Sequence, residues 1–276
     1  MHHANHFYGH AHIMSQYAGL PQSQRIWGYL QHGWNILDGF AVGTDFGPGM
    51  PKFVWSDSVR RRGHAMGRRN YAVVGAPWMY LLELEPELRK QAPDAAGTIF
   101  YPFHGWEGQH VDGSHDALVR EIQQNEDGPV TICLYWHEYR MPEVRAIYER
   151  AGFEVITHGY RGLHWRDTDH EFLFNQLKEL RRHRRVASNR MSSAIFYGAS
   201  LGLQPGVYGD PMVLRGESPS FGGMARMRRL WPEMHQPYVP MDYAMATTRT
   251  ELGADRLAGP EAIRELFGWT SVSPAG

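Results

Sequence analysis

Apolar residues in this chain gather in short runs that end at polar or glycine residues. Short runs rich in β-branched and aromatic residues are typical of strands, and runs that are apolar throughout are typical of parallel strands covered on both faces. The segment 130–136, VTICLYW, is the clearest example. The pattern predicts strands at 26–34, 52–55, 71–75, 97–101, 130–136, 153–157, 186–187 and 207–208.

Between most of these runs, apolar residues recur at helical spacing. We expect Asp57 or Ser58 to cap the helix after the second strand, Pro77 to open the next helix, and Gly152 to end a later one. The pattern predicts helices at 58–69, 77–82, 115–124, 142–151, 170–183, 192–201 and 259–269, and an irregular segment at 213–250.

Strand and helix alternate through most of the chain. This order is typical of an α/β protein with parallel sheets and helices on both faces. The loop at 107–114 divides the predicted elements into two sets of similar size. We expect two Rossmann-like halves whose parallel sheets face a cleft, at 1–112 and 113–276, with the C-terminal helix packing back on the body. One continuous doubly wound sheet is the alternative.

Composition narrows the class of protein. The chain has 276 residues, of which 42% are hydrophobic and 21% charged, so it can bury a sizeable core. A formal net charge of −1 gives no overall attraction to nucleic acid, and we expect no nucleic-acid partner. The only cysteine, Cys133, lies in an apolar run, which favours an inert core thiol and a cytoplasmic protein. No apolar stretch approaches the ~18–20 residues that cross a bilayer, so any membrane contact is expected to be peripheral, at the inner face.

Three local features add to this picture. The arginines at 60–62, 68–69, 181–182 and 184–185 favour solvated helix faces, with an anionic ligand or membrane surface as the alternative. The five histidines among the first twelve residues are more typical of a solvated segment or a packed helix start than of a metal site, because no cysteine or carboxylate lies beside them. Aromatic residues make up 13% of the chain, and some of these rings are expected to bind flat ligands such as bases or sugars.

Ligands of open α/β sheets bind beyond the carboxyl ends of the strands. Polar residues at the ends of the predicted strands are therefore the candidates for a functional site. A Ser or Asp in such a position is as often the cap of the next helix, and for Asp57 and Ser188 both interpretations stay open. The candidates are His32, Asp57, His104, His137, Glu138, His158, Ser188 and Asn189.

The segment 188–193, SNRMSS, joins a predicted strand to a helix and predicts a phosphate-binding site. Backbone N–H groups and the positive end of the helix dipole would face the phosphate, with hydroxyls from Ser192 and Ser193 and a charge from Arg190. The chain contains no GxxxxGK[ST], GxGxxG, GxSxG, HExxH or CxxC motif, which disfavours a P-loop, a dinucleotide fingerprint, an ordinary α/β-hydrolase and common zinc sites. Asp167-Thr168-Asp169 matches a DxD metal pattern, but we favour helix capping for Asp169.

Several segments together carry a family resemblance: LQHGW, WHEY, THGYR, SNRMSSAIFYGASLG and GVYGDPM. With them the chain resembles bacterial glycosyltransferases of the two-Rossmann, GT-B-like type. It resembles more closely the enzymes of surface-polysaccharide and cell-envelope assembly. The resemblance covers about residues 10–212 and the C-terminal helix.

This resemblance implies transfer of a sugar from a nucleotide-sugar co-substrate to a glycan or small-molecule acceptor, with no metal or other cofactor required. The N-terminal half would bind the acceptor and supply the base, which is His32, Asp57 or His104. Three alternatives stay open: a pyruvyl or other group transferase acting on a glycan, a non-catalytic nucleotide- or sugar-binding protein, and a His-rich metalloenzyme. The C-terminal half would bind the donor through His137, Glu138, His158, Gly159, Ser188, Asn189, Arg190, Ser192 and Ser193.

Overall fold

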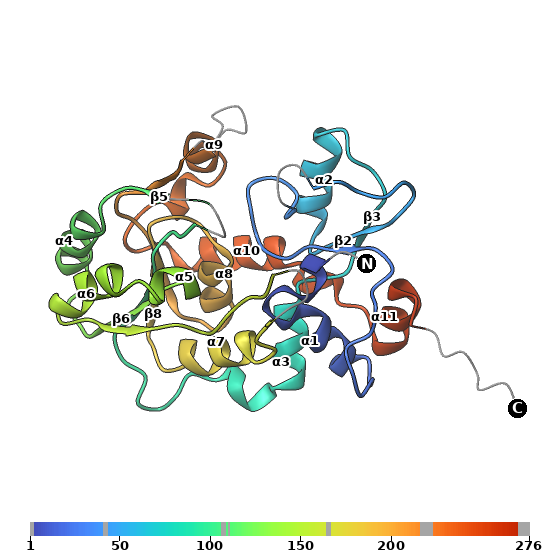
Figure 1. Cartoon of the computed structure of the whole chain (residues 1–276), viewed down its shortest axis with the longest axis horizontal. Coiled ribbons are helices and arrows are strands. Elements are labelled where there is room, and N and C mark those ends of the chain that lie inside the picture. The colour runs from blue at the N-terminus through green and yellow to red at the C-terminus, as the bar shows by residue number, and fades with distance from the viewer. Residues whose placement is uncertain are drawn as a thin grey trace, which may run out of the picture. The chain divides into compact units, whose positions relative to one another are not determined.

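The chain forms two compact units in the computed structural model (Figure 1), which describes residues 3–40, 44–105, 109, 111–163, 167–215 and 223–269. Unit 1 comprises Met1–Pro86, Arg161–Leu173 and Arg249–Gly276, and unit 2 comprises Glu87–Tyr160 and Phe174–Thr248. The chain therefore passes between the units four times, whereas the sequence predicted a single boundary at residue 112. Part of the predicted dividing loop, and His2 of the N-terminal histidines, lie outside the described residues.

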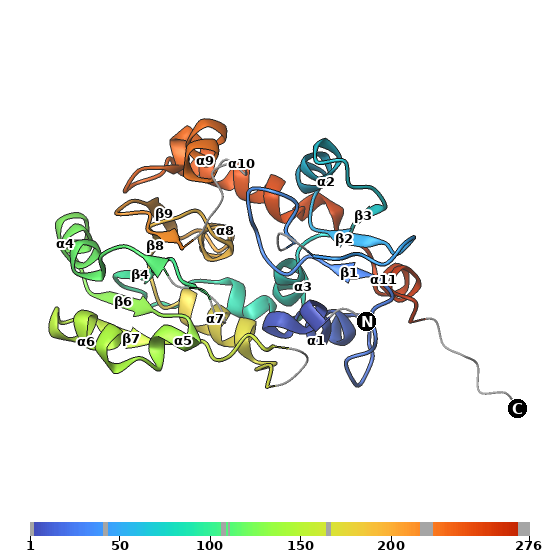
Figure 2. The same ribbon diagram turned by 45° about the horizontal axis from the view of Figure 1, so that its top comes forward.

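Unit 1 contains a three-stranded parallel sheet in the order β1-β2-β3 (Figure 2). The strands are β1 (Tyr29–Leu30), β2 (Lys52–Val54) and β3 (Tyr71–Val73). Strand β1 is much shorter than the predicted run 26–34, because only Tyr29 and Leu30 pair with β2. Phe40, Val54 and Val59 form a buried core, against which Tyr29, Phe46, Tyr71 and Val73 pack.

Unit 1 contains the helices predicted at 58–69, 77–82 and 259–269, with one shift, and also helices at 3–9, 10–17 and 254–256 that were not among the predicted ones. The Oγ of Ser56 accepts a hydrogen bond from the backbone N of Val59 at 3.2 Å, so Ser56 caps the second helix. The predicted caps, Asp57 and Ser58, were wrong, because Ser56 is the residue with extended backbone before the first helical turn. The helices are η1 (His3–Gly9), α1 (His10–Tyr17), α2 (Asp57–Ala65), α3 (Pro77–Leu84), η5 (Ala254–Arg256) and α11 (Pro260–Phe267).

Unit 2 contains a five-stranded parallel sheet in the order β7-β6-β4-β8-β9. Together with the sheet of unit 1 it confirms the predicted α/β fold with two parallel sheets. Strand β4, which the sequence placed in the N-terminal half, lies at the centre of this second sheet. The strands are β4 (Thr98–Tyr101), β6 (Val130–Cys133), β7 (Glu154–Ile156), β8 (Arg185–Ser188) and β9 (Gln204–Val207).

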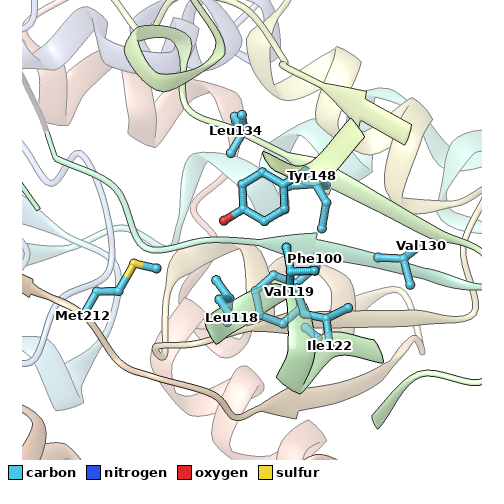
Figure 3. Close-up of a cluster of buried hydrophobic side chains, with 10 residues drawn as sticks. Phe100, Leu118, Val119, Ile122, Val130, Leu134, Tyr148 and Met212 are labelled. Carbon is cyan, nitrogen blue, oxygen red and sulfur yellow. The ribbon is translucent and has the colours of Figure 1, made fainter. Parts of the chain in front are cut away.

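Side chains alternate across the sheet of unit 2, so each face has its own helices. On one face, Phe100 of β4 and Ile132 of β6 pack against α4 (His115–Asn125) and α6 (Pro142–Arg150), as Figure 3 shows for Phe100, Leu118, Ile122 and Tyr148. On the other face, α8 (Ser193–Ser200) packs against β8. The remaining helices before residue 200 are η2 (Pro86–Arg89), α5 (Trp136–Tyr139) and α7 (Phe172–Leu180).

The segment 213–250 was expected to be irregular, and this prediction was wrong. Its first residues form β10 (Val213–Leu214), which pairs antiparallel with β5 (Val111–Asp112). Among the residues described after it are the helices α9 (Gly223–Leu230), η4 (Pro232–Met234) and α10 (Met241–Leu252). The sequence of α10, MDYAMATTRTEL, has few large apolar residues at helical spacing, so periodicity alone did not indicate it. No helix in the described part of the chain is long and apolar enough to cross a bilayer.

Arginines from both the 60–69 and the 181–185 segments form ion pairs inside the protein. Arg185 pairs with Glu126 at 2.9 Å, and the Glu126 side chain is only 2% exposed. Arg62 pairs with Glu251 at 2.7 Å, where the glutamate side chain is again 2% exposed. Because a charge buried in this way needs its partner, these arginines belong to the fold and are not part of a solvated helix face.

Candidate functional site

The order of the strands in unit 2 indicates where a ligand would bind. Strand β4 comes first in the chain, the next two strands are added on one side of it, and the last two on the other. The order therefore reverses between β4 and β8. In doubly wound sheets the carboxyl ends of the strands at such a switch point border the ligand. The segments that follow β4 and β8 are thus the first place to look for a site.

Polar side chains join the segments that follow these strands. The Oδ1 of Asn189 accepts a hydrogen bond from the backbone N of Phe103 at 2.6 Å, and its Nδ2 donates to the carbonyl of Asp210 at 2.7 Å. The Oγ of Ser188 donates to the carbonyl of Tyr101 at 2.7 Å. Both residues are almost completely buried. They hold the strand ends together, so they support a site at this edge by positioning its loops.

Arg190 does not occupy the position expected of a phosphate ligand. Its Nε donates to the carbonyl of Pro211 at 2.7 Å, and its guanidinium also donates to the carbonyl of Met212. The guanidinium carbon lies 3.8 Å from the centre of the Phe103 ring, and the residue is 5% exposed. A buried guanidinium satisfied by carbonyls stabilises the loop after β9, which corrects the role inferred from the sequence.

The start of α8 directly follows β8 and remains the candidate anion site. Ser192 is the N-cap residue, yet its side chain makes no capping hydrogen bond. Its buried Oγ has no hydrogen-bond partner among the described residues. Ser193 is the first residue of the helix, which runs for eight residues. The N–H groups of a first helical turn have no partner within the helix, and with the helix dipole they favour a phosphate.

Two further candidates meet at the ends of β4 and β6. The backbone N of Gly105 donates to Oε1 of Glu138 at 3.0 Å, while Oε2 of Glu138 makes no hydrogen bond to the described residues. The Nδ1 of His104 lies 2.6 Å from the carbonyl of Gly105. Because a carbonyl only accepts, Nδ1 carries the proton, and in the neutral ring the basic lone pair is on Nε2.

His158 lies inside unit 2, away from the expected contact with a donor. It is 4% exposed, and its Nε2 lies 2.9 Å from the hydroxyl of Tyr101. Burial lowers the pKa of His158 to about 4, so the ring is neutral at physiological pH. Gly159 follows with φ of 106°, a conformation that side chains disfavour. These two residues shape the chain after β7 and do not add a charged contact.

In unit 1, His32 and Asp57 follow the ends of β1 and β2, as predicted. His32 lies edge-on to Phe7, with 5.7 Å between the ring centres. The carboxylate of Asp57 pairs with Arg60 at 2.6 Å and also with Arg256. An anion at the start of α2 stabilises the helix, and this carboxylate is already engaged by two cations. Of the two, His32 is therefore the better candidate for a base.

The side chains of the candidate residues form no evident metal site in the part of the chain that the structure describes. The described residues contain no cluster of three or more His, Cys, Asp or Glu side chains able to hold a metal ion. In the DxD segment, Oδ1 of Asp169 accepts a hydrogen bond from the backbone N of Glu171 at 2.9 Å, just before α7 begins. This contact forms a turn ahead of the first residue of α7, and the capping role favoured for Asp169 stays a prediction.

The structure also brings together residues that the sequence analysis did not select. These are Tyr135 and Trp136 after β6, and Tyr160 after β7. Tyr135 contacts His104 and His137, and Tyr160 contacts His137 and Trp136. Their aromatic side chains could have indicated a binding site, since aromatic rings at strand ends suit flat ligands. Tyr135 and Trp136 were instead included in the predicted strand at 130–136, and Tyr160 lies just beyond the predicted strand at 153–157.

The fold and the strand-end groups define unit 2 as a doubly wound α/β unit with a candidate anion site at its switch point. No family model matches the chain, and no curated protein matches it. Among solved structures it is similar to the wall teichoic acid polymerase TagF, with a TM-score of 0.34 and 10% identity over 79% of this chain and 53% of that one. It is also similar to S. aureus MnaA solved with UDP, with a TM-score of 0.35 and 12% identity over 76% of this chain and 63% of that one. The chain thus spans between half and two thirds of the length of these structures.

Proposed function

We propose that this protein is a glycosyltransferase that moves a sugar from a nucleotide-sugar donor to a glycan or small-molecule acceptor, and that unit 2 binds the donor. The observation that carries the proposal is the uncapped start of α8 beside the switch point of a doubly wound sheet. Such a place suits the diphosphate of a nucleotide-sugar. The sequence motifs that resemble cell-envelope glycosyltransferases add support.

The start of α8 would also assist the reaction. When the bond between the sugar and the phosphate breaks, negative charge grows on the leaving phosphate. The first-turn N–H groups of α8 and the hydroxyls of Ser192 and Ser193 are fixed donors that would stabilise this charge without a metal. The second oxygen of Glu138 would accept a hydrogen bond from a ribose hydroxyl of the donor. We propose that unit 1 binds the acceptor. The base that accepts its proton would be a residue of unit 1 or His104 of unit 2.

The first test is a thermal-shift panel with UDP, GDP, CMP, dTDP and their sugar forms, with and without magnesium. A ligand at 100 times its dissociation constant stabilises the fold by about 2.7 kcal/mol, which raises the melting temperature measurably. We expect one nucleotide class to stabilise the protein and its sugar form to be turned over. Binding without turnover would instead indicate a non-catalytic nucleotide- or sugar-binding protein.

A paired substitution tests the phosphate site. Ser192→Ala together with Ser193→Ala is expected to weaken binding of the nucleotide by about 1–3 kcal/mol, because the loss of each hydroxyl would leave a phosphate oxygen without a donor. Ser200→Ala, at the other end of α8, is the matched control and leaves affinity unchanged. Equal affinity of the double variant and the wild type, measured by calorimetry, would remove α8 from the proposed site.

A further inference from the structure

Aromatic side chains gather at the ends of three neighbouring strands of unit 2. The ring of His104, after β4, stacks on Tyr135 with 4.5 Å between centres and 25° between planes. His137 lies edge-on to Tyr135 at 5.3 Å and to Tyr160 at 5.9 Å. Trp136 lies 6.4 Å from Tyr160. We call these five residues, His104, Tyr135, Trp136, His137 and Tyr160, the aromatic cluster.

The rings of this cluster are not all part of the core. Tyr135 is 7% exposed, whereas the other four residues are partly exposed. An apolar ring with a polar edge that stays partly in contact with solvent is typical of a site that a flat ligand covers. The same cluster contributes imidazole and phenol groups, which could meet the polar edge of such a ligand.

The register of the sheet places the aromatic cluster beside the proposed phosphate site. Tyr101 at the end of β4 pairs with Ser188 at the end of β8, and Phe100 pairs with Ile132 of β6. The strands therefore end at the same level. Neighbouring strands lie ~4.8 Å apart, so the ends of β8 and β6 are separated by about 10 Å, with β4 between them. A nucleotide has its phosphate and its base separated along one molecule in this way.

We propose, on the basis of the function proposed above, that the aromatic cluster binds the nucleobase of the donor by stacking. The diphosphate would lie at the start of α8, on the β8 side of the switch point. The base would extend over the ends of β6 and β7, where the partly exposed rings of Trp136 and Tyr160 lie. In doubly wound sheets the nucleoside lies on this side of the first strand, over the strand added next.

Comparing the affinity for nucleotides with the affinity for inorganic pyrophosphate distinguishes recognition of the base from recognition of the phosphate. Each base stacked on an aromatic ring contributes about 1–3 kcal/mol to binding. Trp136→Ala or Tyr160→Ala is therefore expected to weaken binding of the nucleotide that the wild type prefers, among UDP, GDP, CDP and dTDP, by about 5- to 150-fold. Binding of pyrophosphate stays unchanged in both variants. Tyr160→Phe keeps the ring and retains nucleotide affinity. Tyr238→Ala is the matched control, because Tyr238 is a 53% exposed tyrosine of unit 2 outside the cluster.

Each other outcome overturns a defined statement. If the wild type binds a nucleotide no more tightly than pyrophosphate, the base is not recognised and the inference fails. If the alanine variants keep nucleotide affinity, or lose pyrophosphate affinity equally, the cluster is structural and the inference fails while the proposed function stands. If the wild type binds neither ligand and turns over no nucleotide-sugar, the proposed function itself fails. Unliganded melting temperatures of all variants confirm that each is folded.

Discussion

Arg190 lies two residues beyond the end of β8, where its charge alone suggested a phosphate ligand. Its hydrogen bonds to the carbonyls of Pro211 and Met212, and its stacking on Phe103, use the planar fork of the side chain. Lysine carries the same charge but has a single ammonium group and no flat face. The two roles of Arg190, structural and ligand-binding, therefore predict different results for a conservative substitution.

Arg190→Lys is expected to lower the free energy of unfolding by about 1–3 kcal/mol, because at least one buried carbonyl loses its donor. Nucleotide affinity of the folded variant should not change. Urea unfolding and calorimetry measure the two quantities. Arg215→Lys is the control, since Arg215 pairs with Asp112 on the exposed surface and should cost little stability. A variant of full stability that binds nucleotide weakly would restore Arg190 to the phosphate site.

The remaining base candidates are separated by their effect on turnover. The Nδ1 hydrogen bond of His104 leaves Nε2 as the position that would take a proton, so His104→Gln is expected to lower kcat by a factor of about 10²–10⁴, far more than it weakens binding of the donor. His32→Gln is the parallel variant in unit 1, and His64→Gln, on the exposed face of α2, is the control. Normal turnover in both test variants would assign the base to Asp57 despite its two ion pairs.

At the scale of elements, the contact between α8 and β8 leaves no room for a side chain at Gly198. A Cβ added there would lie 2.4 Å from Cγ1 of Val186. Gly198→Ala is expected to destabilise the fold by about 1–3 kcal/mol, because α8 must move away from the sheet. Gly128→Ala is the matched control, since its Cβ would meet only the Cα of Gly97 at 3.6 Å. Thermal unfolding compares them, and equal melting temperatures would show that this packing is loose.

Sequence patterns predicted the elements well where apolar residues form a continuous run or recur at helical spacing. The run 130–136 indicated β6, and the amphipathic segment 115–124 indicated α4, because both depend on neighbours in the sequence. Long-range pairs carry no such signal. The ion pair of Arg62 with Glu251 joins residues 189 positions apart, and nothing near either residue indicates it. For the same reason the sequence could select strand-end residues as candidates but could not show that Arg190 binds the carbonyls of Pro211 and Met212 or that Asp57 pairs with Arg256.

At the scale of the whole molecule, neither unit is a continuous piece of chain. Unit 1 combines Met1–Pro86 with segments from the middle and the end, and α10 runs from unit 2 into unit 1. A cut at residue 112 would therefore leave β4 without β6 and β8. Each unit also contains a buried neutral histidine, which links the stability of both units to pH.

Burial lowers the pKa of His10 in unit 1 to about 3 and that of His158 in unit 2 to about 4, from an ordinary value of 6.5. As pH falls below 6.5 the unfolded chain takes up protons at these positions and the folded protein does not. Their contribution to stability is thus fully present above pH 6.5 and is lost as pH falls toward the folded pKa values. Each histidine is expected to lower the free energy of unfolding by about 2 kcal/mol between pH 7.5 and pH 5.

Urea unfolding at pH 7.5 and pH 5 measures this loss. His158→Gln retains a hydrogen-bonding group toward Tyr101 but does not titrate, so it should reduce the difference between the two pH values by about 2 kcal/mol. His64→Gln, an exposed position, should leave the difference unchanged. A wild-type protein equally stable at both pH values would mean that these histidines take up protons without opening the fold. The neutral, buried state of His158 would then no longer argue against its contact with an anionic donor.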